Sequence, residues 1–123
     1  MDKKRVLIVD DEKSFTQMVK LNLEETGKYI VRTENEGKKA IEAIREFNPH
    51  IIFLDIVMPD MDGGEIAEEI RANKQFHNIP LIFLTAIVKE DEVVSQDGII
   101  GGHPFIAKPV TTEKLIASIE KYT

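Results

Sequence analysis

The sequence predicts an α/β fold in which a doubly wound, five-stranded parallel sheet carries five helices on its two faces. Three observations indicate this class. Five short apolar runs alternate with helical patterns along the 123 residues, as the crossover connections of parallel strands require. The first, third and fourth runs consist almost wholly of Val, Ile, Leu and Phe, which is typical of strands covered on both faces. No linker or low-complexity tract interrupts the chain, so residues 1–123 are expected to form a single domain.

Each strand is expected where β-branched and aromatic residues form a short run. The five runs are RVLIV (5–9), YIVRT (29–33), IIFLD (51–55), PLIFLT (80–85) and PFIAK (104–108). The second run is the most polar, because it contains Arg32 and Thr33. This strand is therefore expected at an edge of the sheet.

Between the strands, apolar residues recur at intervals of three or four, which is the period of an amphipathic helix. The expected buried stripes are Phe15, Met18, Val19 and Leu23, then Ala40, Ile41, Ile44 and Phe47, and finally Leu115, Ile116, Ile119 and Tyr122. A fourth helix is expected at roughly residues 90–96, between the fourth and fifth strands. It is a weak helix, because it runs into DGIIGGH, whose glycines disfavour helical structure.

Cap and turn residues mark the ends of the helices. Gly27 is a stop signal for the first helix, and Asn48-Pro49 closes the second just before its strand. Asp62, with Glu65 three residues later, has the spacing of a capping box and opens the third helix. These signals agree with the positions of the strands.

Composition excludes several classes of function. The chain has 16 Lys and Arg against 22 Asp and Glu, a net charge of −6, which argues against direct nucleic-acid binding. No apolar run approaches the roughly 18 to 20 residues of a membrane span, and the short apolar run near the start is not an export signal. The absence of cysteine fits a cytoplasmic location.

Functional groups follow four of the five strands. Asp10 and Asp11 follow the first strand, Asp55 ends the third, Thr85 the fourth and Lys108 the fifth, whereas the second contributes none. The carboxyl ends of parallel strands meet at one rim, where ligands of such sheets bind. Three carboxylates in one place repel one another unless a cation lies between them, and Mg²⁺ is the hard ion that shares its shell with phosphate. Solvated loop acids are the alternative interpretation.

The chemistry that suits this rim is phosphoryl transfer. A carboxylate such as Asp55 can attack phosphorus to form an acyl phosphate. Such a transfer needs positioning and charge cancellation rather than a strong base. No phosphate-binding loop of the GxxxxGK[ST] type is present, so a phosphohistidine is a better candidate donor than ATP.

Four motifs resemble those of the receiver domains of bacterial two-component response regulators, including chemotaxis regulators. They are DD (10–11), LD-x-x-MP-D-MDG (54–63), TA (85–86) and KP (108–109), and the match extends over essentially the whole chain. The resemblance implies a flavodoxin-like fold with strand order 2-1-3-4-5. It also implies that the Lys108-Pro109 peptide bond is cis.

The resemblance assigns roles to particular residues. Asp55 would accept the phosphoryl group, and Mg²⁺ would be held by Asp10, Asp11, Asp55 and the backbone carbonyl of Val57. Thr85 and Lys108 would contact the phosphoryl group. Phe105 would be the switch aromatic, which fills the space that Thr85 vacates, although an aromatic in an outer strand is more often part of the core.

Two apolar residues flank the expected acyl phosphate. They are Val57 and Ile87, two positions beyond Asp55 and Thr85. Neither side chain can hydrogen-bond an attacking water, so we expect slow self-dephosphorylation. The alternative is that Val57 only packs against a neighbour.

The implied partners are a sensor histidine kinase or a histidine phosphotransfer protein upstream, and a downstream protein or a fused output domain. No output domain is expected within this chain, and a phosphorylation-dependent homodimer is compatible with the resemblance. Receiver domains catalyse their own phosphorylation and dephosphorylation but are not turnover enzymes.

Two other hypotheses stay open. A Mg²⁺-dependent aspartyl-phosphate hydrolase of the haloacid-dehalogenase kind also places a nucleophilic Asp on a doubly wound sheet. It would use Asp-x-Asp after the first strand and a cap insertion, whereas this chain has Asp10-Asp11 and no insertion. An interaction domain that works without phosphorylation is the second hypothesis, and the complete set of acceptor residues argues against it.

Overall fold

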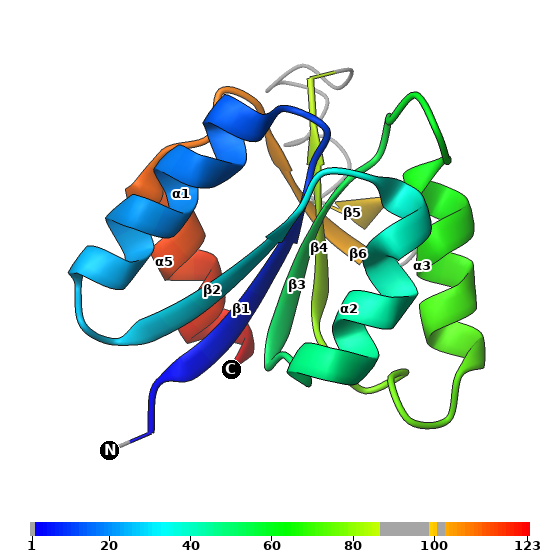
Figure 1. Ribbon diagram of the computed structural model, residues 1–123, viewed down its shortest axis with the longest axis horizontal. Helices are drawn as coiled ribbons and strands as arrows, with labels where there is room; N and C mark the ends of the chain where they lie inside the picture. The colour runs from blue at the N-terminus through cyan, green and yellow to red at the C-terminus, as the bar shows by residue number, and fades with distance from the viewer. Residues whose placement is uncertain (1, 87–98, 101–102) are drawn as a thin grey trace.

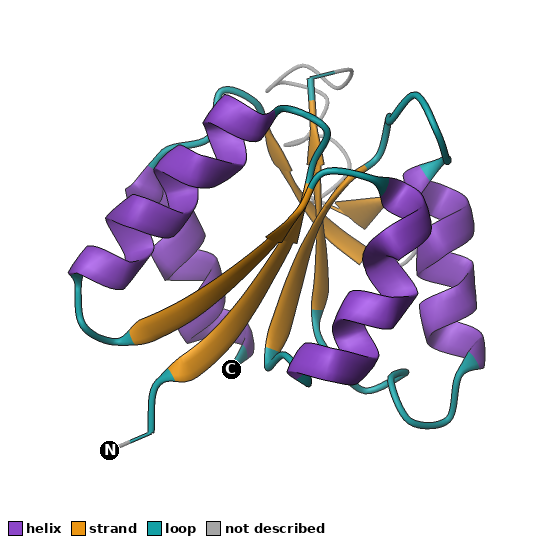
Figure 2. Ribbon diagram, in the orientation of Figure 1, coloured by secondary structure: helices purple, strands orange, loops and turns teal. Residues whose placement is uncertain are grey.

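The computed structural model describes residues 2–86, 99–100 and 103–123. A sheet is sandwiched between two helical layers, with α1 and α5 on one face and α2 and α3 on the other (Figures 1 and 2). The strands are β1 (Lys4–Val9), β2 (Tyr29–Glu34), β3 (Ile51–Asp55), β4 (Leu81–Thr85), β5 (Ile99–Ile100) and β6 (His103–Ala107). The helices are α1 (Lys13–Glu25), the 3-10 turn η1 (Gly37–Lys39), α2 (Ala40–Phe47), α3 (Gly63–Ala72) and α5 (Thr112–Tyr122).

The strand order is β2-β1-β3-β4-β6-β5, and the first five of these strands are parallel. The predicted order 2-1-3-4-5 is therefore confirmed, with β2 at an edge. The two-residue strand β5, which pairs antiparallel with β6, was not expected. The helix expected at residues 90–96 and most of the glycine-rich stretch lie outside the described residues.

Side chains of one strand alternate between two apolar clusters. In β1, Val6 and Ile8 face the α1 and α5 layer, while Leu7 and Val9 face α2 and α3. Strands β3 and β4 alternate in the same way, and every residue of both is buried. This double coverage explains why these runs are apolar without interruption.

The buried stripes differ from the prediction at two residues, because Met18 of α1 is 48% and Tyr122 of α5 is 37% exposed. In α1, Thr16, Val19 and Leu23 are buried instead. Met18 and Thr16 both fit the helical steps of three and four residues, so the period alone does not choose between them. Thr16 tolerates burial because its hydroxyl donates to the carbonyl of Lys13 and accepts from Asn35.

The predicted cap residues Gly27, Asn48 and Asp62 lie at helix ends, but no hydrogen bond between the described residues joins the Glu65 side chain to Asp62 to complete a capping box. Gly27 has φ of 78° and Asn48 has φ of 52°, both in the left-handed region that ends a helix. Asp62 is the N-cap of α3, and its carboxylate accepts a hydrogen bond from Gly64 N at 2.9 Å. The Lys108-Pro109 peptide bond is cis, as the resemblance implied.

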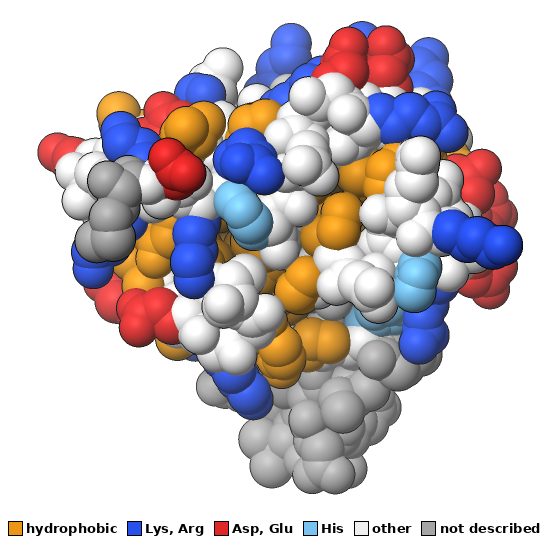
Figure 3. Space-filling view, turned by 90° about the horizontal axis from the view of Figure 1, so that it is seen from below, with side chains coloured by type: hydrophobic (Ala, Val, Ile, Leu, Met, Phe, Trp, Pro, Cys, Tyr) orange, Lys and Arg blue, Asp and Glu red, His pale blue; other side chains and the backbone are white. Residues whose placement is uncertain are grey.

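The carboxyl ends of the parallel strands lie at the top of Figure 1, and the amino ends form the underside. Figure 3 shows Lys and Arg side chains over that underside. Exposed Lys3 and Lys28 directly precede β1 and β2 there. Among the described residues, no helix has the length and apolar character needed to cross a membrane.

Candidate functional site

Strands β1 and β3 bring the predicted carboxylates together. They are parallel neighbours with Val9 opposite Leu54, so Asp10 and Asp55 leave the sheet side by side. Asp10, Asp11 and Asp55 can each offer one oxygen, and these oxygens lie within 4.8 Å of one another. The predicted carboxylate cluster is present at the rim.

Two of the three carboxylates are buried. Asp10 is 0% and Asp55 6% exposed, whereas Asp11 is exposed. Burial raises the pKa of Asp10 above its ordinary value. Burial, reinforced by the nearby charge of Asp10, raises the pKa of Asp55 to about 6. The fold therefore holds these groups where ionisation is unfavourable without a compensating cation.

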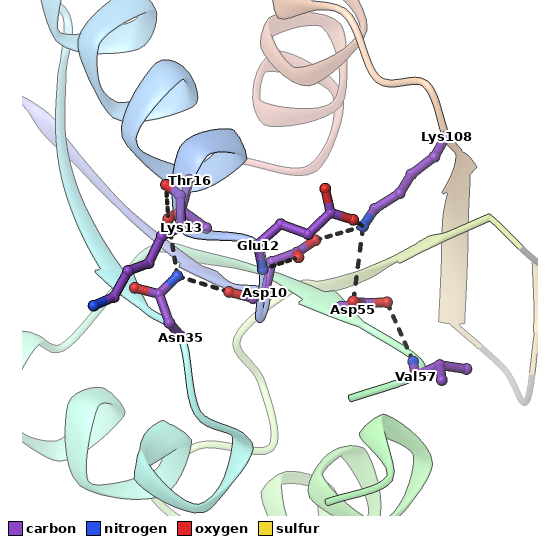
Figure 4. A network of polar contacts seen from close by, with 8 residues as sticks. All are labelled: Asp10, Glu12, Lys13, Thr16, Asn35, Asp55, Val57 and Lys108. Atoms are coloured by element: carbon purple, nitrogen blue, oxygen red, sulfur yellow. Dashed lines mark hydrogen bonds and ion pairs between the residues drawn. The ribbon is translucent and has the colours of Figure 1, made fainter. Parts of the chain in front are cut away.

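Lys108 supplies part of that compensation from the end of β6. Its Nζ lies 2.8 Å from Asp10 Oδ2, 3.7 Å from Asp55 Oδ2 and 3.5 Å from Glu12 Oε1 (Figure 4). Burial opposes the charge of the ammonium group, but the contact with Asp10 outweighs it, and the pKa of Lys108 is raised. One ammonium group thus faces several carboxylates.

The two oxygen atoms of each buried carboxylate have different partners. Glu12 N donates to Asp10 Oδ1 at 3.0 Å, and Val57 N donates to Asp55 Oδ1 at 3.2 Å. Asp10 Oδ2 is buried, and its nearest charged partner is the Lys108 ammonium group, whose Nζ is 2.8 Å away. Three carboxylates that share one ammonium group are the donor set of a hard cation such as Mg²⁺.

Thr85 and Phe105 occupy different environments. Thr85 ends β4 next to Leu84, the partner of Asp55, and is 1% exposed. Its carbonyl accepts a hydrogen bond from Lys108 N at 2.8 Å, which ties the ends of β4 and β6 together. Phe105 pairs in register with Phe83, is 5% exposed and belongs to the apolar core. Ile87 lies outside the described residues.

Val57 is 55% exposed and belongs to neither apolar cluster. Its side chain points away from the carboxylates in Figure 4, while its backbone N–H faces Asp55. This large exposed fraction argues against the alternative that Val57 only packs against a neighbour.

Two further residues of the rim, Glu12 and Asn35, were not predicted from the sequence. Glu12 contacts Lys108. Its position directly after Asp10-Asp11, as a third consecutive acidic residue, could have indicated that it belongs to the rim. Asn35 follows β2, and its Nδ2 donates to the carbonyl of Asp10 at 2.8 Å and to Thr16 Oγ1 at 3.0 Å (Figure 4). The statement that the second strand contributes nothing to the rim was therefore wrong. The signal was a polar residue immediately beyond that strand.

Comparison with known proteins agrees with this geometry. Residues 6–120 match the family described as the response regulator receiver domain. The chain is similar to the chemotaxis protein CheY4 of Vibrio cholerae, with 27% identity and a TM-score of 0.83 over 99% of this chain and 100% of that one. It is also similar to the receiver domain of Francisella response regulator 1452, with 28% identity and a TM-score of 0.80 over 98% and 96% of the two chains. A signal receiver domain of a histidine kinase from Syntrophus aciditrophicus shows 28% identity and a TM-score of 0.79 over 97% and 89%.

Proposed function

The chain belongs to the response regulator receiver family, and from this premise we propose that it is a phosphorylation-switched signalling domain whose phosphoacceptor is Asp55. The observation that carries the proposal is the placement of the Asp55 carboxylate. It is 6% exposed at the rim, within 4.8 Å of oxygens from Asp10 and Asp11, and 3.7 Å from Lys108 Nζ.

The proposed reaction begins with an ionised Asp55. Because its pKa is about 6, most of this carboxyl group is ionised at neutral pH. One oxygen attacks phosphorus, a P–O bond forms and the P–N bond to the donor imidazole breaks. The second ring nitrogen of the donor phosphohistidine carries a proton, so the imidazole leaves as a neutral molecule with the P–N bonding pair, and no general acid is needed on this chain.

Several groups of the chain would orient the phosphoryl oxygens. The Lys108 ammonium already lies at the edge of the Asp55 carboxylate, and the Val57 N–H already points at it. The hydroxyl of Thr85, at the end of the adjacent strand, would take a third oxygen. These fixed donors would cancel charge where it develops in the transition state.

Mg²⁺ is the proposed cofactor, held by Asp10, Asp11, Asp55 and the backbone carbonyl of Val57. The support is the cluster of three carboxylates, two of them buried, that share the single ammonium group of Lys108. When bound, the ion would neutralise charge on the phosphoryl oxygens. The residues present fit this ion.

The proposed output is a change in the face built from β4, β6 and α5, together with the chain that connects them. Thr85 would move towards the phosphoryl group and Phe105 would follow it, which biases a two-state equilibrium. Phe105 is buried in the core. The switch therefore requires repacking of a buried ring and would appear as changed side-chain NMR signals for Phe105 on phosphorylation.

The proposed upstream partner is a sensor histidine kinase or a histidine phosphotransfer protein, and the downstream partner is a separate protein or a fused output domain. A hollow beside Lys108 supports an upstream partner that docks next to Asp55. It is lined by residues before and in α1, after β4 and in the β6–α5 connection, namely Glu12, Phe15, Met18, Ala86, Lys108, Pro109 and Val110. Met18 is 48% exposed, and an exposed apolar side chain at such a place suits protein contact. A cytoplasmic location follows from this proposed partnership.

The proposal excludes a turnover enzyme and can be tested directly. The protein is incubated with acetyl phosphate, with and without Mg²⁺, and intact mass is measured alongside hydrolysis of p-nitrophenyl phosphate. We expect addition of one phosphoryl group, only with Mg²⁺, and no sustained ester hydrolysis. Sustained turnover would support the hydrolase, and no mass change under any condition would support an interaction domain that works without phosphorylation.

A further inference from the structure

We propose that Asp60 is a positioning residue for the metal site, because it fastens the loop that carries Val57 to the turn at η1. The inference rests on the proposed function, since the Val57 carbonyl is one of the proposed Mg²⁺ ligands. Asp60 is distinct from the residues to which the family resemblance assigns a role.

Asp60 lies in the β3–α3 loop and reaches across to a different part of the chain. Its Oδ1 accepts from Gly37 N and its Oδ2 from Lys38 N, each at 3.1 Å. These two bonds lower the pKa of Asp60 below its ordinary value, Lys38 contributing more than Gly37. The residue is exposed, so the carboxylate is held by directed hydrogen bonds rather than by burial.

Apolar packing reinforces the same junction. Gly37 is buried, and a Cβ placed on it would lie 3.0 Å from Ile66 Cδ1, 3.1 Å from Met61 Cβ and 3.2 Å from Met58 Cε. The two methionines flank Asp60 in the loop, and Met58 is 6% exposed. The loop therefore packs onto η1 at a position where a side chain would crowd its neighbours.

A second contact, separate from the Asp60 hydrogen bonds, closes the base of the loop. Gly63 N donates to the carbonyl of Ile56 at 2.8 Å, so residues 56–63 form a loop closed at its neck. Val57 lies just inside that neck, and its N–H is bonded to Asp55. A loop fixed at its neck alone can still rotate, whereas a second attachment at Asp60 also fixes its orientation. The direction of the Val57 carbonyl is therefore set by both attachments, the one at the neck and the one at Asp60.

The consequence is a coupling between the metal site and η1. Preorganised ligands bind a metal more tightly than ligands that must first be ordered, and outer residues that orient them affect affinity by about tenfold or more. By thermodynamic reciprocity, Mg²⁺ binding would also stabilise the Asp60 hydrogen bonds. The amides of Gly37 and Lys38 would then exchange more slowly when Mg²⁺ is present.

The test compares Asp60→Ala and Asp60→Asn, which carry the same charge but differ in the ability to accept a hydrogen bond. Mg²⁺ affinity is measured by calorimetric titration, and exchange of the Gly37 and Lys38 amides is measured by NMR with and without Mg²⁺. We expect Asp60→Ala to bind Mg²⁺ about tenfold more weakly than the parent and Asp60→Asn to lie between them. Phosphorylation at saturating Mg²⁺ should remain near the parent rate.

Two further variants complete the design. Glu65→Ala removes a nearby exposed carboxylate and should leave Mg²⁺ affinity unchanged. Gly37→Ala should weaken Mg²⁺ binding by crowding Met58 and Met61. Equal affinity for the parent and Asp60→Ala, or equal weakening in Asp60→Ala, Asp60→Asn and Glu65→Ala, would overturn the inference. A parent protein that binds no Mg²⁺ would instead overturn the proposed function, and the inference with it.

Discussion

Lys108 Nζ lies 2.8 Å from Asp10 Oδ2, although the two residues follow different strands, β6 and β1, which are not neighbours in the sheet. The side chain of Lys108 is 16% exposed and that of Asp10 is 0% exposed. The ion pair therefore spans the rim across β3 and β4, and its charges are little screened by solvent.

Lys108→Met should destabilise the protein in a pH-dependent way. Removing one member of a buried ion pair leaves the other charge uncompensated, and we expect a loss of about 2–3 kcal/mol at about pH 8 without Mg²⁺. The loss should shrink at about pH 5, because Asp55, with its pKa of about 6, is then largely protonated. Urea unfolding at both pH values measures this, with Lys114→Met, a change at an exposed lysine of α5, as the control. Equal losses in the two variants would contradict the expectation.

Asp55→Asn should stabilise the protein in the absence of Mg²⁺. The folded pKa of Asp55 is about 6 and lies above the ordinary value of 3.8 for an aspartate, so the folded state binds the proton more tightly than the unfolded state. Ionisation of Asp55 therefore lowers stability as the pH rises from about 4 to 6, and an uncharged Asn escapes this loss. We expect a gain of about 1–2 kcal/mol at about pH 8 that vanishes below about pH 4. A gain that does not depend on pH would contradict this electrostatic origin.

Val57→Asn should accelerate loss of the phosphoryl group. An amide at this 55% exposed position could hydrogen-bond an attacking water, and one such bond of about 1.4 kcal/mol in the transition state corresponds to about tenfold in rate. Val57→Ala removes bulk without adding a hydrogen bond and separates the two effects. Decay of the phosphorylated protein is followed by mass spectrometry, and an unchanged rate for Val57→Asn would count against slow dephosphorylation through an apolar residue here.

Gly63→Ala should damage both stability and phosphorylation. A Cβ on Gly63 would lie 2.7 Å from Ile56 Cα and closer still to the carbonyl oxygen of Asp55, so the end of β3 must move. We expect a loss of about 2–4 kcal/mol in unfolding free energy. The matched control is Gly64→Ala, whose Cβ would make only ordinary contacts with the Asp62 carboxylate, the nearest at 3.5 Å from Oδ1. That control should be neutral or slightly stabilising within α3, and similar losses in both variants would contradict the steric argument.

Most of the fold could be predicted because its signals are local. The buried strands are continuous apolar runs, and Gly27 and Asn48 end their helices in left-handed conformations that their residue types favour. The strand order came from the resemblance rather than from the residues themselves. The pairing of β5 with β6 and the burial of Thr16 in place of Met18 depend on neighbours distant in sequence, which periodicity does not describe.

The part of the candidate site that lies at the ends of strands could be predicted from the sequence. Asp10, Asp11, Asp55, Thr85 and Lys108 lie at or next to the carboxyl ends of parallel strands, so topology alone gathers them. The positions of Asn35 and Asp60 depend on loop conformation, because each side chain bonds to backbone atoms far away in the sequence. A polar residue directly after a strand is a local signal for Asn35, but no local pattern identifies the backbone partners of either side chain.

The most direct test is to trap the acyl phosphate and locate it. The protein is incubated with acetyl phosphate and Mg²⁺, reduced with borohydride, which converts an aspartyl phosphate to homoserine, and digested for peptide mass spectrometry. We expect conversion at residue 55 in the parent protein and none in Asp55→Asn. Conversion at another aspartate, or none in a parent protein shown to bind Mg²⁺, would contradict this expectation.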